Sequence, residues 1–162
     1  MALEIRKAKR SDLHAMLEMM HEHARFERSE PPNADESRLV EAIFRTPRLL
    51  CAWIALVDDK SVGYMTATRE FSTWRAAAFM HMDCLYVRAD YRGMGIGVRL
   101  IAALRDFCAG EGIDQVQWQT PGWNRDAARF YRRLGAKQCT KRRFTWQIDP
   151  RQVIRTLDEK PG

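Results

Sequence analysis

The sequence predicts an α+β, three-layer protein in which a mixed, mainly antiparallel central sheet carries helices on both faces. Three β-rich segments at about 49–57, 62–71 and 77–87 are joined by short turns, so they pair antiparallel. A glycine-rich turn then leads into an amphipathic helix at about 95–109, and another strand follows at 113–120. A strand, a helix and a second strand in this order predict parallel pairing at that end of the sheet.

The elements before this sheet are one strand and two helices. Residues 3–9 alternate apolar and basic side chains, as a half-solvated strand does. Ser11-Asp12 then offers an N-cap for a helix that ends near residue 28, and a second helix spans about 36–45 after the breaker segment 29–35. The first helix repeats its apolar residues at helical spacing, namely Leu13, Met16, Leu17, Met20 and Ala24.

The C-terminal part predicts one more helix and one more strand. The helix begins at Asn124 or Asp126 and ends at Gly135, and the strand spans 137–148 with alternating Phe144, Trp146 and Ile148. We expect a single domain over residues 1–150, followed by a C-terminal tail over 151–162.

The composition is that of a globular protein, and it argues against several classes of function. Hydrophobic residues make up 46% and charged residues 30% of 162 residues. We find neither a membrane-length apolar run nor a signal-peptide pattern, and therefore expect a cytoplasmic protein without a membrane partner. The net charge of +6 is spread along the chain, which argues against nucleic acid. The four cysteines are widely spaced, so we expect reduced thiols and no metal site.

Residues 82–100 are the stretch with the clearest chemistry: a strand, a glycine loop and a helix. A helix N-terminus offers free N–H groups, and glycines let the backbone approach an anion, so this order is suited to phosphate. A Rossmann fingerprint would need glycine where Val98 stands, and the Gly-Lys-Ser/Thr triplet of a P-loop is absent from the sequence.

Three motifs resemble the GCN5-related N-acetyltransferases over residues 3–148. They are the loop Arg92-x-x-Gly95-x-Gly97, the helix-opening Asn124, and Phe130-Tyr131-x-x-x-Gly135-Ala136. The resemblance implies acetyl-CoA as co-substrate. It places the pyrophosphate on Arg92, Gly93, Met94, Gly95, Ile96 and Gly97, and the pantetheine arm along Leu85, Tyr86, Val87, Asn124 and Tyr131.

Within the family, the chain looks most like the diamine (spermidine/spermine) and thialysine acetyltransferases. That branch carries a Glu on the strand before Asp-Tyr-Arg-Gly, where this chain has Asp83. The resemblance implies a homodimer and a small cationic amine, either a polyamine or a lysine-like compound. Acetylation of a protein N-terminus, a lysine side chain or an amine antibiotic is the alternative, and a non-catalytic acyl-CoA sensor is the third hypothesis.

Acetylation of an amine requires a base, because a free alkyl ammonium has a pKa of about 10. We assign this role to Asp83, with Glu27, Glu30 or His81 as substitutes, and assign the general acid, by resemblance, to Tyr131. The expected substrate site comprises Phe26, Glu27, Glu30, Trp74 and Asp83. The acidic residues between the first two helices have an alternative interpretation, namely a solvated loop without a role in substrate binding. Direct transfer is expected, and a covalent acetyl-Cys84 is the alternative.

Overall fold

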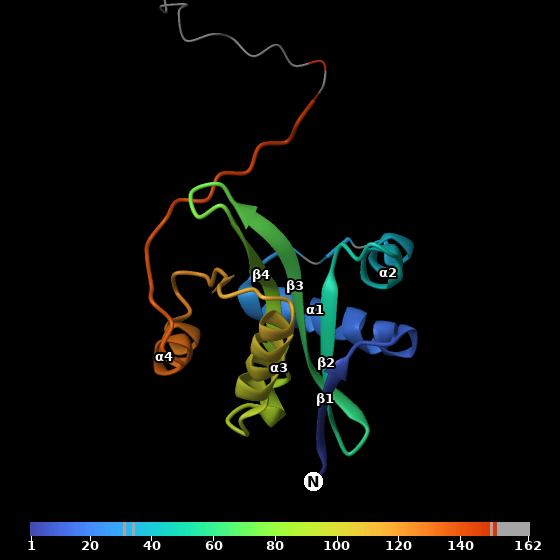
Figure 1. The fold of residues 1–162 in the computed structure, drawn as a ribbon. Coiled ribbons are helices and arrows are strands. Elements are labelled where there is room, and N and C mark those ends of the chain that lie inside the picture. The colour runs from blue at the N-terminus through green and yellow to red at the C-terminus, as the bar shows by residue number, and fades with distance from the viewer. Residues whose placement is uncertain (31, 34, 150, 152–162) are drawn as a thin grey trace, which may run out of the picture. The chain divides into compact units, whose positions relative to one another are not determined.

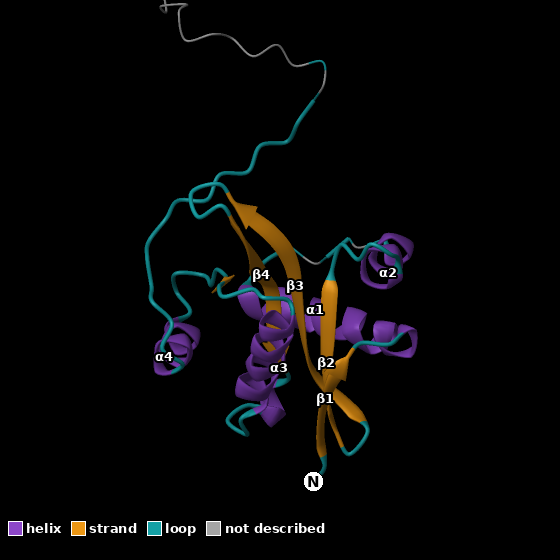
Figure 2. Cartoon of the chain, in the orientation of Figure 1, coloured by secondary structure: helices purple, strands orange, loops and turns teal. Residues whose placement is uncertain are grey.

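A five-stranded sheet forms the centre of residues 1–122, as the computed structural model shows (Figure 1, Figure 2). The model describes residues 1–30, 32, 33, 35–149 and 151. The strands lie in the order β1-β2-β3-β4-β5, antiparallel from β1 to β4 and parallel between β4 and β5. They are β1 (Leu3–Lys7), β2 (Cys51–Val57), β3 (Lys60–Ser72), β4 (Ala77–Val87) and β5 (Val116–Gln117). The predicted α+β class with a mixed sheet is confirmed.

Helices cover both faces of this sheet (Figure 1). On one face lie α1 (Leu13–Glu27) and α2 (Glu36–Phe44), whose Met16, Met19 and Ile43 pack in one buried cluster with Ala52 and Ile54 of β2. On the other lies α3 (Ile96–Gly110), whose Phe107 ring meets the Trp53 ring edge-to-face at 5.6 Å. Short 3-10 turns, η1 (Arg10–Asp12) and η2 (Ala89–Tyr91), precede α1 and α3.

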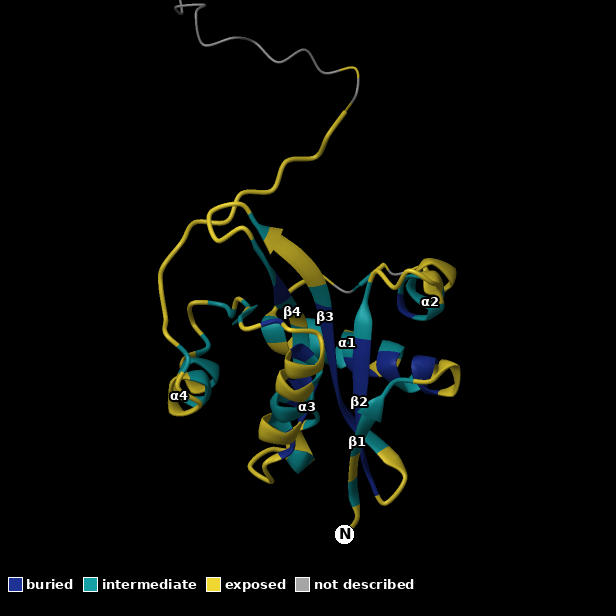
Figure 3. Ribbon diagram, viewed as in Figure 1, coloured by how far each residue is buried: buried dark blue, intermediate teal, exposed yellow. Residues whose placement is uncertain are grey.

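The buried residues of β2 and β3 form the centre of this core, whereas the far end of β3 is exposed (Figure 3). Side chains of successive strand residues point to opposite faces, which is why Ile54 faces the α1 side and Trp53 the α3 side. The nearly continuous apolar sequence of β2 follows from burial on both faces.

Asp12 begins α1 differently from the sequence prediction. Its carboxylate makes no hydrogen bond to the first turn of the helix. It accepts instead from the Arg6 guanidinium at 2.6 and 2.9 Å and from the backbone N–H of Lys9 at 2.6 Å. The charged guanidinium is the stronger donor and comes from β1, which sequence spacing does not reveal.

Two predicted strands are also shorter or absent. The strand expected over 113–120 is reduced to Val116–Gln117, because its pairing with β4 covers only Met80 and His81. The strand predicted over 137–148 is not formed, and Phe144, Trp146 and Ile148 are exposed. Alternating apolar side chains define a face, but a strand also needs a hydrogen-bonding partner, and alternation alone does not supply one.

Residues 123–162 form a second compact unit, which we describe by itself. Its helix α4 (Arg125–Arg133) begins at Asn124, whose side chain accepts a hydrogen bond from the Ala127 N–H at 3.0 Å. Gly135 follows the helix with a left-handed φ of +87°, as a C-terminal glycine does. The single domain over 1–150 stays a prediction, and of the predicted tail only Arg151 lies among the described residues.

Within the described ranges, no helix is both long and apolar enough to cross a membrane.

Candidate active site

A bulge in β4 sets the position of Asp83. Cys84 pairs with Thr66 of β3 and Met82 pairs with Ala67, so Asp83 is the extra residue between two paired positions. Bulges re-aim side chains and bend the strand that contains them. The Asp83 side chain is exposed, and its Oδ2 lies 3.7 Å from the Sγ of Cys84.

Beyond the bulge, no strand among the residues that the structure describes pairs with one edge of β4. The last residue of β4 that pairs with β5 is His81, whereas β4 itself continues to Val87. The backbone N–H of Arg88 donates to Val62 O of β3 at 2.8 Å, so the backbone groups of Arg88 point toward β3. Backbone N–H and C=O groups of successive strand residues point to opposite edges, so those of Leu85 and Val87 point to the open edge. The Leu85 N–H is therefore available to a ligand lying along this edge.

The glycine loop follows directly and adopts the conformation that its glycines permit. Gly93 and Gly95 have left-handed φ values of +78° and +77°, and a Cβ at either position would meet no atom within 4 Å. Gly95 is the N-cap of α3, and Ile96, 2% exposed, anchors the first turn in the core. The space beside these two glycines is open, and a helix start offers free N–H groups, so the loop suits an anion.

The two arginines around the loop have different partners. Arg92 donates Nε–H to Val87 O at 2.8 Å and stacks its guanidinium on the Phe26 ring of α1 at 4.3 Å. Arg88 forms an ion pair with Glu22 of α1 at 2.9 Å. Arg88 therefore ties α1 to β4, and Arg92 fixes Phe26 beside the loop.

The C-terminal half of α1 brings a histidine and a carboxylate to the same region. His23 Nδ1 lies 3.0 Å from the Tyr64 hydroxyl, and Nε2 lies 3.3 Å from Glu27 Oε1. The His23 ring stacks on Tyr86 at 5.1 Å. Burial lowers the pKa of His23, although the carboxylates of Glu27 and Asp83 oppose this shift.

The Cys84 thiol is a poor nucleophile in these surroundings. Burial and the nearby Asp83 carboxylate raise its pKa to about 11, so it is protonated at neutral pH. A nucleophilic cysteine needs its thiolate. Burial also raises the pKa of Tyr64, whose hydroxyl lies 3.0 Å from His23 Nδ1.

The structure brings only some of the predicted substrate residues together. Phe26, Glu27 and Asp83 converge on the His23–Arg92 region, as the contacts above show. Trp74 is fully exposed on the turn between β3 and β4. Asp83 is six residues from the start of β4 at Ala77, or ~20 Å along the strand, so Trp74 is remote from it. Glu30 is exposed beyond the end of α1.

Asn124 and Tyr131 belong to the second unit. The Asn124 side chain caps α4, and the Tyr131 ring lies edge-to-face with Phe130 at 5.2 Å.

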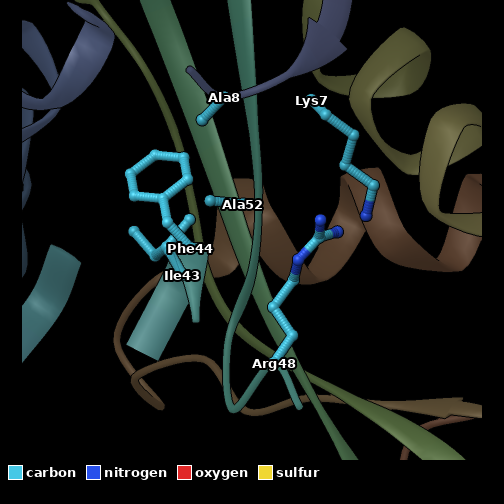
Figure 4. A pocket seen from close by; sticks show the side chains of 6 residues that line it. All are labelled: Lys7, Ala8, Ile43, Phe44, Arg48 and Ala52. Atoms are coloured by element: carbon cyan, nitrogen blue, oxygen red, sulfur yellow. The ribbon is translucent and has the colours of Figure 1, made fainter. Parts of the chain in front are cut away.

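A small cavity lies away from the glycine loop, between α2 and the ends of β1 and β2 (Figure 4). Its volume is about 80 Å³, and its walls are Lys7, Ala8, Ile43, Phe44, Arg48 and Ala52. Ligand pockets are usually about 300–1,000 Å³, so this cavity is too small for a cofactor. Among the residues described, no three His, Cys, Asp or Glu side chains gather as metal ligands would.

His23 and Tyr64 are site residues that sequence reasoning missed. His23 and Glu27 are four residues apart on α1, which predicts that they are neighbours on one helix face. Met16, Met19 and His23 fall on the core-facing side at helical spacing, and this periodicity could have placed the imidazole against the sheet.

Comparison with known proteins agrees with this geometry. Residues 15–136 match a family model described as "Acetyltransferase (GNAT) family". The thialysine N-epsilon-acetyltransferase of Caenorhabditis elegans is 25% identical over 146 residues, covering 89% of this chain and 90% of the relative. The Bos taurus enzyme of the same name is 26% identical, covering 85% of each chain. An aminoglycoside acetyltransferase from an uncultured soil metagenomic sample superposes with a TM-score of 0.76 at 21% identity, covering 91% of this chain and 97% of that structure.

Proposed function

The chain belongs to the acetyltransferase (GNAT) family and is an N-acetyltransferase, and we propose that it moves the acetyl group of acetyl-CoA to a small cationic amine. The family uses acetyl-CoA as its co-substrate. The observation that carries the proposal is the glycine loop at the open edge of β4. A Cβ at Gly93 or Gly95 would meet no atom within 4 Å, and helix α3 begins directly after Gly95.

These residues fit the two ends of acetyl-CoA. The pyrophosphate would accept hydrogen bonds from the loop and the first turn of α3, where backbone N–H groups and the helix dipole both favour negative charge. The pantetheine amides would pair with the free edge of β4 at Leu85 and Val87, as an added strand does. We keep Asn124 and Tyr131 as proposed contacts of the pantetheine arm and the thioester.

Charge favours a cationic amine as the acceptor. Glu27 Oε1 lies 3.3 Å from His23 Nε2, and Asp83 Oδ2 lies 3.7 Å from Sγ of Cys84, which packs against the core cluster on the α1 side of the sheet. The two carboxylates therefore lie on the same side of the sheet. The Phe26 ring beside them already stacks with a cation, the guanidinium of Arg92. Two curated relatives are named thialysine acetyltransferases, and thialysine is a lysine-like amine. A polyamine or a lysine-like amino acid would satisfy both carboxylates.

The proposed reaction is direct transfer in a ternary complex. Asp83 accepts a proton from the ammonium, the freed amine attacks the thioester carbonyl carbon, and the Leu85 N–H stabilises the oxyanion that forms. The C–S bond then breaks, Tyr131 gives the CoA thiolate its proton, and the nitrogen of the new amide loses its second proton through solvent, which reprotonates Tyr131. The protonated state of Cys84 supports this mechanism over a covalent acetyl-cysteine.

The test is thiol release from acetyl-CoA with polyamines, lysine-like amino acids, aminoglycosides and short peptides as acceptors. We expect turnover with the small cationic amines. We expect Asp83→Asn to lower kcat by ~100-fold or more, since general bases contribute about 10²–10⁴-fold. Asp106→Asn removes an exposed aspartate on α3 that pairs with Arg105, and serves as the matched control with unchanged kcat.

Turnover with peptides or aminoglycosides but with none of the small amines would reject the proposed substrate class and favour the alternative acceptors. Tight acetyl-CoA binding without turnover on any acceptor would favour a non-catalytic sensor. The homodimer remains a proposal that rests on the resemblance to the diamine acetyltransferase branch, and the cytoplasmic location remains a prediction from the sequence.

A further inference from the structure

We propose that His23 is a positioning residue for the acceptor: it holds one oxygen of Glu27 in place, so that this carboxylate receives the second cationic group of a diamine. The inference rests on the proposed function and narrows the small cationic amines to those with two positive groups. In this arrangement Asp83 takes the amine that is acetylated, and Glu27 binds the amine at the other end.

His23 lies on the face of α1 that packs against the sheet, where two tyrosines hold its ring. Nδ1 of His23 lies 3.0 Å from the hydroxyl of Tyr64 on β3. The ring stacks on Tyr86 of β4, with the centroids 5.1 Å apart and the planes inclined by 26°. Tyr64 and Tyr86 are 1% and 8% exposed. The imidazole is therefore held by side chains that are fixed parts of the core.

The remaining nitrogen of the ring contacts Glu27. Nε2 of His23 lies 3.3 Å from Oε1 of Glu27, which is one turn further along α1. The His23 side chain is 12% exposed and the Glu27 side chain 33%. A ligand on this side of the sheet therefore meets the carboxylate rather than the imidazole behind it, so His23 acts on a ligand through Glu27.

These two contacts assign the proton of the imidazole. A carboxylate only accepts hydrogen bonds, so in a neutral ring Nε2 carries the N–H and donates to Glu27. Nδ1 then accepts, and the hydroxyl of Tyr64 donates to it. Burial lowers the pKa of His23, which favours the neutral ring, although the Glu27 carboxylate opposes this shift. Both ring nitrogens thus have a partner.

An imidazole at this position does more than fill the core. Met16 and Met19, on the same face of α1, pack in the core cluster without any hydrogen bond to maintain. A buried polar ring is tolerated only when its nitrogens are bonded, which an apolar side chain would not require. In return, the ring fixes one oxygen of a partly exposed carboxylate. A ligand then binds to Glu27 without first having to immobilise its long side chain.

The carboxylate held in this way lies on the same face of β4 as Asp83. Cys84 and Tyr86 are two residues apart on β4 and point to the same side, against one core cluster. Asp83 Oδ2 lies 3.7 Å from Sγ of Cys84, and the His23 ring lies on Tyr86. A linear diamine along this face meets a carboxylate with each of its ends, whereas a monoamine uses Asp83 alone.

The first experiment measures kcat and KM with linear diamines of increasing length and with monoamines of the same chain lengths. His23→Leu removes both hydrogen bonds, and His23→Gln keeps an N–H near the Nε2 position. For His23→Leu we expect the KM of diamines to rise roughly 3–10-fold, the cost of immobilising one long side chain, with kcat and the KM of monoamines nearly unchanged. His23→Gln should restore most of the diamine KM.

The control for these variants is His14→Leu, which removes an exposed histidine from the same helix and should leave both KM values unchanged. A purely structural role of His23 would affect diamines and monoamines alike and would not be rescued by glutamine. Either result, in variants whose folds are checked by thermal unfolding, would overturn the proposal.

A double-mutant cycle tests whether His23 acts through Glu27. Glu27→Gln should raise the KM of diamines by itself, because it removes the negative charge. Adding His23→Leu to this variant should cause little further rise, since the carboxylate that His23 positions is gone. Additive effects of the two changes would overturn the proposal.

Two measurements need no turnover. Nitrogen-15 spectra of the histidine rings, assigned with His23→Gln, should show the proton of His23 on Nε2 at neutral pH, and a proton on Nδ1 would overturn the proposal. Calorimetric titration with a diamine in the presence of CoA should show weaker binding to His23→Leu than to the wild-type protein. Equal diamine affinities, with acetyl transfer intact, would refute this inference alone. Diamine binding that depends on His23, without acetyl transfer by the wild-type protein, would refute the proposed function alone.

Discussion

Replacing Gly95 with alanine should weaken acetyl-CoA binding far more than it weakens the fold. Gly95 has a φ of +77°, which an alanine adopts at a cost of about 1–2 kcal/mol. No atom lies within 4 Å of the added Cβ, so the strain is confined to the backbone. For a chain of this size, 1–2 kcal/mol corresponds to a decrease of roughly 2–8 °C in Tm. The methyl group would, however, project where the pyrophosphate must approach the loop.

Gly112 provides a matched control at the other end of α3. Its φ is +67°, and a Cβ there also meets nothing within 4 Å, so Gly112→Ala imposes the same kind of strain away from the loop. Calorimetric titration with acetyl-CoA should show at least tenfold weaker binding for Gly95→Ala, or about 1.4 kcal/mol, and unchanged binding for Gly112→Ala. Equal affinities in the two variants, with equal Tm values, would refute the assignment of the loop to the pyrophosphate.

Three further predictions concern the buried ion pair and the thiol. Asp12→Ala should destabilise the fold by about 3 kcal/mol in denaturant unfolding, because Asp12 and Arg6 are only 8% and 21% exposed and the change leaves Arg6 with the more exposed Glu4 at 3.3 Å as its ion-pair partner. The hydrogen bond from Arg6 lowers the folded-state pKa of Asp12. The ion pair therefore stabilises the fold fully above the unfolded-state pKa of about 4, and this stabilisation is lost as the pH falls below that value. Denaturant unfolding measured between pH 6 and 3 will show the loss, and a free energy of unfolding that stays constant over this range would contradict it. Cys84→Ser should retain acetyl transfer within a few-fold, and complete loss together with an acetylated Cys84 in the wild-type protein would indicate covalent catalysis.

Much of the fold follows from local sequence signals. Helical spacing located α1, α2 and α3, and the short turns between apolar segments gave the antiparallel pairing of β2, β3 and β4. Asn124 acts as the predicted N-cap, because an amide one residue before the helix reaches the free N–H groups of the first turn.

The remaining differences come from contacts that local sequence patterns do not show. Arg6 takes the carboxylate of Asp12 away from α1, although only the tertiary fold brings the two side chains into contact. The residues at 137–148 have the alternation of a strand, but alternation does not supply a neighbouring edge.

In the candidate site, too, features encoded by consecutive residues could be predicted, and features that depend on tertiary contacts could not. The glycine loop could be predicted because its chemistry lies in consecutive residues. The bulge at Asp83 could not, because it depends on how β4 registers against β3. The contact of His23 with Tyr64 joins residues 41 apart in the chain, so only the fold reveals it.

The most direct test of the central claim is mass spectrometry of the products after incubation with acetyl-CoA and either a polyamine or a lysine-like amine. The account predicts one acetyl group on the amine for each CoA released, with no acetyl group left on the protein. Intact acetyl-CoA and unmodified amine with every cationic acceptor would contradict it.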